Sequence, residues 1–155
     1  MKNYTIKKML VEELHTLVQL FEYNDVDAMI AENTNAIINN TGSIFTLYED
    51  DMLIGELHVK YKSEDVLEAK LNQRAYLFAY RIHKNYQGKG LGKLLLTTVI
   101  NTLEKEGYKE LTIGVEDDNL LARHIYEAYG FEEVIERKRE RFQENFYEYD
   151  LLLRK

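Results

Sequence analysis

The chain has 155 residues, a length typical of one domain, and we expect residues 1–155 to form a single domain. Its formal net charge of −7 argues against general binding to nucleic acid or to an anionic membrane, and the absence of cysteine excludes disulfides, thiolate metal sites and a cysteine nucleophile. The N-terminal residues show no signal-peptide pattern, and no stretch approaches the ~20 apolar residues that span a bilayer. These features predict a cytoplasmic protein.

The first half of the chain predicts a strand, a helical region and a hairpin. Alternating residues predict a strand over residues 4–8. Apolar residues at helical spacing then predict one or two helices over residues 11–34, with a break near Asn24. Two further strands, joined by a tight turn, are predicted over residues 43–50 and 52–62.

The second half predicts a strand, a helix, a strand, a helix and a closing pair of strands, at residues 75–83, 91–106, 109–116, 119–129, 131–142 and 145–155. Gly107 and Gly130 stand where the two helices should end, and Asp118 or Asn119 should cap the second helix. The helix over 91–106 makes a crossover, which predicts that its two flanking strands are parallel. The fold class is α+β: a mixed, mostly antiparallel central sheet with helices on both faces, in three layers.

Three of the 8 glycines lie within five positions, at Gly88, Gly90 and Gly92, where the strand over 75–83 gives way to the helix. Glycine lets the backbone approach a ligand closely, and the first turn of a helix offers free N–H groups at the positive end of the helix dipole. Together these features are typical of an anion site, most often for phosphate. A plain tight turn is the less favoured alternative.

Two familiar phosphate motifs do not match this loop. A Walker loop requires glycine where Gln87 stands and Ser or Thr where Leu94 stands, and a dinucleotide fingerprint requires a third glycine where Lys93 or Leu95 stands. A nucleoside triphosphate or NAD is therefore a weaker prediction than another phosphate-bearing ligand.

The charge pattern points to the same region. No Asp or Glu occurs between Glu68 and Glu104, although an even spread of the acidic residues would place roughly six there. The same window holds six basic residues: Lys70, Arg74, Arg81, Lys84, Lys89 and Lys93. An acidic chain with an acid-free window around a glycine loop favours a polyanionic ligand over a merely solvated basic face.

At this point the sequence resembles the GNAT superfamily of N-acetyltransferases. The family's loop, Arg/Gln-x-x-Gly-x-Gly/Ala, is similar to the six residues Gln87-Gly88-Lys89-Gly90-Leu91-Gly92, although Lys84 stands where a proline is common. Further along the chain, the residues Asn119, Ala122, Tyr126 and Gly130-Phe131 resemble the second signature of the family. The resemblance covers about residues 74–131.

The resemblance implies an N-acetyltransferase that transfers acetyl from acetyl-CoA to an amine, either a small cationic molecule or a peptide or protein amine. It also implies that the two parallel strands splay apart, so that the first of them offers free backbone groups to the pantetheine arm. The implied cofactor-binding residues are Tyr80, Ile82, His83, Lys84, Gln87, Gly88, Lys89, Gly90, Leu91, Gly92, Lys93, Asn119 and Tyr126.

The chemistry expected here is direct transfer in a ternary complex, because the chain has no cysteine and its two serines lie in no nucleophile context. Within the resemblance, Tyr126 is the expected general acid; packing against the sheet is the alternative. The base is open among Glu56, His58, Glu116 and water, with Glu56 as the favoured candidate.

The four histidines show no metal spacing, so no metal is predicted. We expect a monomer or a homodimer. Two other classes of function stay open from the residues: a CoA-binding module without catalysis, and a phosphate-binding protein for another nucleotide.

Overall fold

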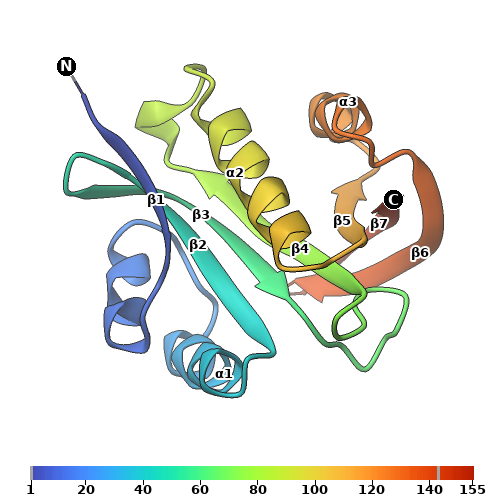
Figure 1. Ribbon diagram of the computed structural model, residues 1–155, viewed down its shortest axis with the longest axis horizontal. Coiled ribbons are helices and arrows are strands. Elements are labelled where there is room, and N and C mark those ends of the chain that lie inside the picture. Colours follow the sequence, from blue (N-terminus) through green and yellow to red (C-terminus); the bar gives the residue numbers. More distant parts are fainter. Residues whose placement is uncertain (1, 143) are drawn as a thin grey trace.

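The computed structural model describes residues 2–142 and 144–155. Figure 1 shows the elements in chain order: β1 Tyr4–Lys8, the 3₁₀ helix η1 Val11–Gln19, α1 Val26–Ile38, β2 Gly42–Glu49, β3 Met52–Lys60, β4 Arg74–Ile82, the 3₁₀ turn η2 Lys84–Tyr86, α2 Leu91–Lys105, β5 Glu110–Glu116, α3 Leu120–Ala128, β6 Glu133–Phe142 and β7 Asn145–Arg154.

The seven strands form one sheet in the order β1-β2-β3-β4-β5-β7-β6. Neighbouring strands are antiparallel except β4 and β5, which are parallel because α2 carries the chain back across the sheet. The predicted mixed, mostly antiparallel sheet with one parallel pair is therefore confirmed.

Helices cover both faces of the sheet, as Figure 1 shows: α2 and α3 lie on one face, and η1 and α1 on the other. The larger core lies under α2, whose apolar residues recur at helical spacing and bury one stripe: Leu91, Leu95, Leu96, Val99, Ile100 and Leu103. A smaller core joins η1 and α1 to the opposite face, around Leu14, Leu17, Met29 and Ile44. None of the helices in the described ranges combines the length and apolar character that a bilayer crossing requires.

The helical region before β2 differs in detail from its prediction. Its first helix is a 3₁₀ helix, and α1 runs four residues beyond the predicted end at residue 34, to Ile38. The break lies near Asn24, as predicted, and it has a local cause. The Asp25 side chain accepts a hydrogen bond from the backbone N–H of Ala28 at 2.9 Å, so a new helix begins there.

The closing pair of strands also begins later than predicted, at Glu133. Gly130 ends the helical turn with a φ of +93°, and Phe131 then turns inward until its side chain is fully buried in the core under α2. The chain reaches the edge of the sheet only after this anchor. The element η2, a single 3₁₀ turn, was not predicted because its three residues carry no periodic pattern.

Candidate active site

The parallel pair β4–β5 separates halfway along its length. The two strands pair from Arg74 opposite Glu110 to Leu77 opposite Ile113. No further pairing joins them in the described chain, although β4 continues for five residues beyond Leu77. The backbone edge of β4 that faces β5 is therefore open over its outer half, as the resemblance implied.

A β-bulge causes this separation. Ala79 adopts a φ of +48°, and the pairing of β4 with β3 shifts by one residue at this point, between Glu56 and His58. An extra residue on one strand bends it and raises its twist, which moves the outer half of β4 away from β5.

The bulge also reverses the alternation of side chains. Before it, Leu77 belongs to the core under α2, while Tyr76 and Phe78 pack on the opposite face. After it, Tyr80 and Ile82 face the α2 side. Side chains of both faces therefore meet where the strands separate.

The glycine loop enters α2 beside this opening. Gly88 and Gly90 have φ values of +78° and +79°, a left-handed conformation that favours glycine, and the space where a Cβ would stand is empty at both. The first backbone N–H bonded within the helix is that of Leu94, to the Gly90 oxygen at 3.1 Å. The helix geometry leaves the N–H groups of the preceding turn free to face an anion.

Two contacts fasten the loop to β4. The Gln87 side-chain amide donates to the Ile82 carbonyl oxygen at 2.8 Å, and the Tyr80 hydroxyl donates to the Gly92 carbonyl oxygen. A Cβ at Gly92 would lie 3.0 Å from the Tyr80 hydroxyl oxygen, so this third glycine permits close packing of the helix on the strand.

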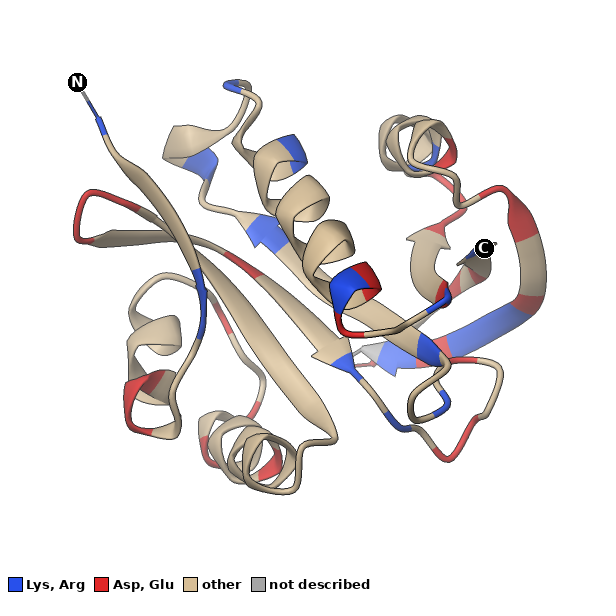
Figure 2. Ribbon diagram, viewed as in Figure 1, with Lys and Arg blue, Asp and Glu red and all other residues tan. Residues whose placement is uncertain are grey.

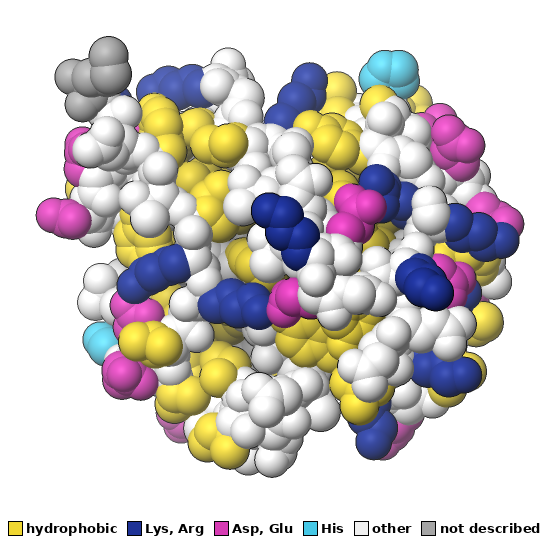
Figure 3. Space-filling view, viewed as in Figure 1, with side chains coloured by type: hydrophobic (Ala, Val, Ile, Leu, Met, Phe, Trp, Pro, Cys, Tyr) yellow, Lys and Arg dark blue, Asp and Glu magenta, His cyan; other side chains and the backbone are white. Residues whose placement is uncertain are grey.

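Five of the predicted cofactor residues, Tyr80, Ile82, His83, Lys84 and Gln87, line one hollow. A hollow of about 490 Å³ follows the outer end of β4 and is lined by Leu20, Phe21, Tyr80, Arg81, Ile82, His83, Lys84 and Gln87. Figure 2 shows basic residues and no acidic residue along the end of β4, the loop and the first turn of α2. In the space-filling view of Figure 3, basic side chains stand clear of acidic ones along the upper edge of this face. This region suits a polyanion that lies across the mouth of the opening.

A cavity of about 310 Å³ lies at the separation itself and is lined by Tyr76, Leu77, Phe78, Ala79, Tyr80, Ile113, Gly114, Glu116, Tyr126, Glu140, Tyr147 and Tyr149. Tyr80 and Tyr126 reach it from the α2 and α3 side of the sheet, whereas Tyr76 and Phe78 come from the other face. The cavity thus connects the two faces, as a reaction between ligands from opposite sides requires.

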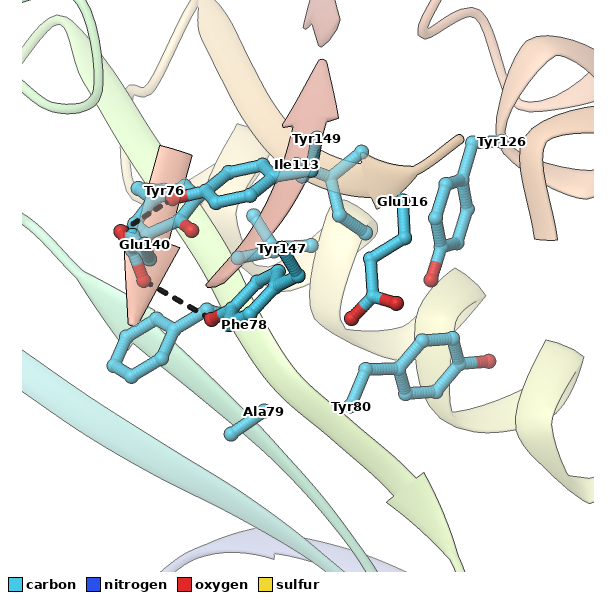
Figure 4. Close-up of a pocket in the computed structure, with 12 residues that line it drawn as sticks. Tyr76, Phe78, Ala79, Tyr80, Ile113, Glu116, Tyr126, Glu140, Tyr147 and Tyr149 are labelled. Atoms are coloured by element: carbon cyan, nitrogen blue, oxygen red, sulfur yellow. Dashed lines mark hydrogen bonds between the residues drawn. The ribbon is translucent and has the colours of Figure 1, made fainter. Parts of the chain in front are cut away.

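Tyr126 is held rigidly on α3. Only 8% of its surface is exposed, and its ring contacts those of Tyr80 and Phe131 at centroid distances of 6.4 and 6.3 Å. Figure 4 shows its hydroxyl directed toward the cavity, which Glu116 also lines. Burial raises the pKa of the Tyr126 phenol to about 12, so it is a proton donor at any physiological pH.

Asn119 begins the same helix. Its side-chain oxygen accepts a hydrogen bond from the Ala122 N–H at 3.1 Å, which confirms the predicted capping role. The amide nitrogen of the same side chain is a further donor that this cap does not use.

Glu56, the expected base, has surroundings of a different kind. It is fully buried, and its two oxygens are bound by the Tyr23 hydroxyl at 2.5 Å, by His58 Nε2 at 2.5 Å and by Arg81 Nε at 2.8 Å. Burial alone would raise the pKa of Glu56, but the combined effect of His58, Arg81 and Tyr23 lowers it below its ordinary value. The oxygens of the Glu56 carboxylate are therefore occupied by these three side chains.

The same network fixes the segment between η1 and α1. The Arg81 guanidinium lies 4.7 Å from the centroid of the Phe21 ring and 4.9 Å from that of the Tyr23 ring. Glu56 therefore anchors Arg81, and Arg81 anchors the segment that covers the outer end of β4.

Sequence reasoning missed the part of the cavity formed by the C-terminal hairpin. Tyr147 and Tyr149 lie two residues apart and therefore share one face of β7, a spacing that could have marked them. Their contact with Glu140 depends on the register that places Glu140 opposite Tyr147, and this register is not visible in the sequence. In the described residues no group of His, Cys, Asp or Glu side chains is arranged to hold a metal ion.

The open parallel pair, the glycine loop at its mouth and the buried phenol of Tyr126 are the features that the resemblance implied. The chain belongs to the acetyltransferase (GNAT) family, whose model matches residues 9–131. It is an N-acetyltransferase that uses acetyl-CoA as donor and an amine as acceptor, and the earlier alternative of another nucleotide-binding protein is set aside.

Three known proteins illustrate the relationship. The [ribosomal protein bS18]-alanine N-acetyltransferase of Haemophilus influenzae is 32% identical over 123 residues, 77% of each chain. The probable spermine N(1)-acetyltransferase of Bacillus subtilis subsp. natto is 33% identical over 86 residues, 55% of each chain. A putative acetyltransferase from Salmonella typhimurium, solved with its cofactor acetyl-CoA, shares the fold at a TM-score of 0.73 and 16% identity, over 97% of this chain and 92% of that one.

Proposed function

We propose that this protein acetylates a primary amine directly, in a complex that holds acetyl-CoA and the acceptor together, and that Tyr126 is the general acid. The observation that carries this proposal is the position of Tyr126, whose ring is fixed in the core while its hydroxyl faces the cavity between β4 and β5. A protonated phenol at that point can donate to a departing thiolate.

The donor would lie along β4, with its pyrophosphate over the loop 87–93. The backbone N–H groups of Gly88 to Lys93 supply the donors, and the exposed ammonium groups of Lys84, Lys89 and Lys93 add positive charge. The unpaired edge of β4 at Tyr80, Ile82 and His83 offers backbone partners for the amides of the pantetheine arm, and Asn119 lies at the start of α3.

The proton transfers can be assigned to two side chains of the cavity. The acceptor nitrogen attacks the thioester carbonyl carbon as the carbon–sulfur bond breaks. Tyr126 gives its proton to the sulfur, and Glu116 takes the proton that the nitrogen loses. We assign this second role to Glu116 because its carboxylate lines the same cavity as Tyr126, whereas the oxygens of Glu56 are already bound.

Two kinds of acceptor agree with the relatives. One relative is named for acetylating the alanine of a ribosomal protein, and another for acetylating spermine. Each is an amine that is cationic in solution and must lose a proton before it attacks. The relatives named for a ribosomal protein also support a cytoplasmic location, while a monomeric or homodimeric state stays a prediction.

A thiol-release assay over a panel of amines tests the proposal, with mass spectrometry of the acetylated product. The purified protein should release free CoA only when an amine is present, and product and thiol should form in equal amounts. A burst of thiol release without acceptor would indicate an acyl-enzyme and would contradict direct transfer.

A further inference from the structure

The half of the cavity that opens on the face opposite α2 is aromatic and acidic. Its lining contains Tyr76, Phe78, Tyr147 and Tyr149, together with the carboxylates of Glu116 and Glu140. Among the described residues that line the cavity there is no Lys, Arg or His. A compartment of this kind attracts cations, through both its carboxylates and the faces of its rings.

Glu140 holds the outer end of this compartment. Its two oxygens accept hydrogen bonds from the Tyr147 hydroxyl at 3.1 Å and from the Tyr149 hydroxyl at 2.6 Å. Burial, and then the charge of Glu140, raise the pKa of Tyr147 to about 12, so these phenols are neutral donors that orient the carboxylate without neutralising it.

The basic side chains of Arg137 and Lys138 pair with acidic residues other than Glu140. Within the part of the chain that the structure describes, no basic side chain forms an ion pair with Glu140. On the same strand, Arg137 pairs with Asp117, Glu148 and Asp150, and Lys138 pairs with Asp65, Glu68 and Glu136.

Lys60 lies over two of the rings that line this compartment. It lies 5.3 Å from the centroid of the Phe78 ring and 6.0 Å from that of the Tyr76 ring, with its nitrogen 3.9 Å from Glu68. Glu140 thus lies at the edge of an aromatic cavity with no ion-pair partner among the described residues.

The proposed reaction does not require this carboxylate. The amine to be acetylated must stand beside Tyr126, where Glu116 can take its proton. In the view of Figure 4 the Tyr147 ring stands between Glu116 and Glu140. The two carboxylates therefore serve two positions along the cavity, and only the one beside Tyr126 belongs to the reacting nitrogen.

We infer that Glu140, framed by Tyr76, Tyr147 and Tyr149, binds a second ammonium group of the acceptor, so that the preferred acceptor is a small diamine or polyamine. This inference rests on the proposed function, because it assumes that the acceptor amine reacts beside Tyr126. The main chain of a peptide acceptor continues from its N-terminal amine into neutral amides, so a peptide of neutral sequence places no positive charge beside Glu140.

A matched pair of acceptors tests the inference: putrescine and n-butylamine have the same carbon chain and differ by one ammonium group. The wild-type kcat/KM should be higher for putrescine by about 10- to 100-fold, in line with a hydrogen bond to a charged group. A peptide that begins with alanine, of neutral sequence, is the third acceptor and should also be used less well than putrescine.

Two variants in the same hairpin locate the effect. Glu140→Gln should bring the ratio of putrescine to butylamine kcat/KM close to one, mainly through the KM for putrescine. Glu148→Gln changes the same residue type on the neighbouring strand, where the side chain pairs with Arg137, and it should leave the ratio unchanged. Because Glu140 is exposed, the substitution should fold, and a melting curve checks this.

The outcomes separate this inference from the proposed function. Turnover of butylamine or of the peptide with no preference for putrescine, or a preference that survives Glu140→Gln, overturns the second-cation site and leaves the proposed reaction intact. If no amine is acetylated although acetyl-CoA binds, the proposed reaction fails. In that event, calorimetry of putrescine binding in the presence of CoA tests the second-cation site by itself. Binding that Glu140→Gln abolishes supports the site, and any other result overturns it.

Discussion

The rings of Tyr80 and Tyr126 lie 6.4 Å apart at the separation of β4 and β5, and in the described chain only the Tyr80 hydroxyl has a protein partner. Tyr80 donates to the Gly92 carbonyl oxygen and so fastens α2 to the strand. The Tyr126 hydroxyl faces the cavity instead. Two neighbouring tyrosines, one buried and one half-buried, therefore have separable roles, which single substitutions can test.

Tyr126→Phe should lower kcat by about 10²-fold or more, because it removes the proton donor and keeps the ring. Tyr80→Phe is the matched control: it should lower the melting temperature slightly through the lost bond to Gly92 and leave kcat within a few-fold of wild type. The assay requires an acceptor for which chemistry limits the rate. Full kcat in Tyr126→Phe under those conditions would make this tyrosine a packing residue.

The kcat/KM of the reaction should show no decrease from deprotonation of Tyr126 below about pH 10. Burial raises the pKa of Tyr126 to about 12, so its protonated form persists as the pH increases. The measured kcat/KM should therefore rise with pH as the acceptor amine loses its proton, and then level off. A decline between pH 8 and pH 10 that is absent in Tyr126→Phe would contradict this assignment.

Gly90→Ala should raise the dissociation constant of acetyl-CoA by about tenfold or more, which corresponds to about 1.4 kcal/mol. The added methyl group lies where the backbone must approach the pyrophosphate. Gly107→Ala is the control, because Gly107 also has a positive φ, of +100°, and open space at its Cβ, but lies at the other end of α2. Both variants should lose similar stability. Equal effects on binding would mean that the loop acts only through the strain of its backbone.

Lys89→Ala and Lys93→Ala should each weaken acetyl-CoA binding by about 1 kcal/mol or less, because both ammonium groups are exposed and screened by solvent. The effect of each variant should shrink as salt is added. Titrations at two ionic strengths measure this. A loss of several kcal/mol that is insensitive to salt would identify a side-chain clamp in place of a charge at the rim.

Glu56→Gln should act mainly on stability. Breaking a buried network of this kind costs about 3–5 kcal/mol, and the protein should melt at a clearly lower temperature. The pKa of Glu56 is lowered in the folded state, so its stabilising contribution is present above its ordinary pKa and is lost as the pH falls through the folded value. The acid-induced loss of stability should accordingly be smaller in the variant.

Glu116→Gln should show the opposite behaviour, because Glu116 is exposed at the cavity and supports no buried network. We expect an unchanged melting temperature and a kcat lower by about 10²-fold, as is typical for the loss of a general base. If instead Glu56→Gln abolishes turnover in a protein that melts normally, the base is Glu56, as the sequence alone suggested.

The features that the sequence determined by itself are local ones. The glycine spacing at 88, 90 and 92 and the cap of α3, predicted at Asp118 or Asn119, each depend on residues a few positions apart, and the structure places the cap at Asn119. The acid-free window and the two motifs are local features as well, and the family was identified from them.

Only the tertiary structure decided how the cavity is lined and what Glu56 does. Tyr23 reaches Glu56 across 33 positions of sequence, and Tyr149 reaches Glu140 only through the register of β6 and β7. A bulge at Ala79, which no local pattern announces, moves side chains of both sheet faces into one space. Periodicity states which face a residue takes, but contacts between distant segments follow from packing and register, and these are properties of the whole sheet.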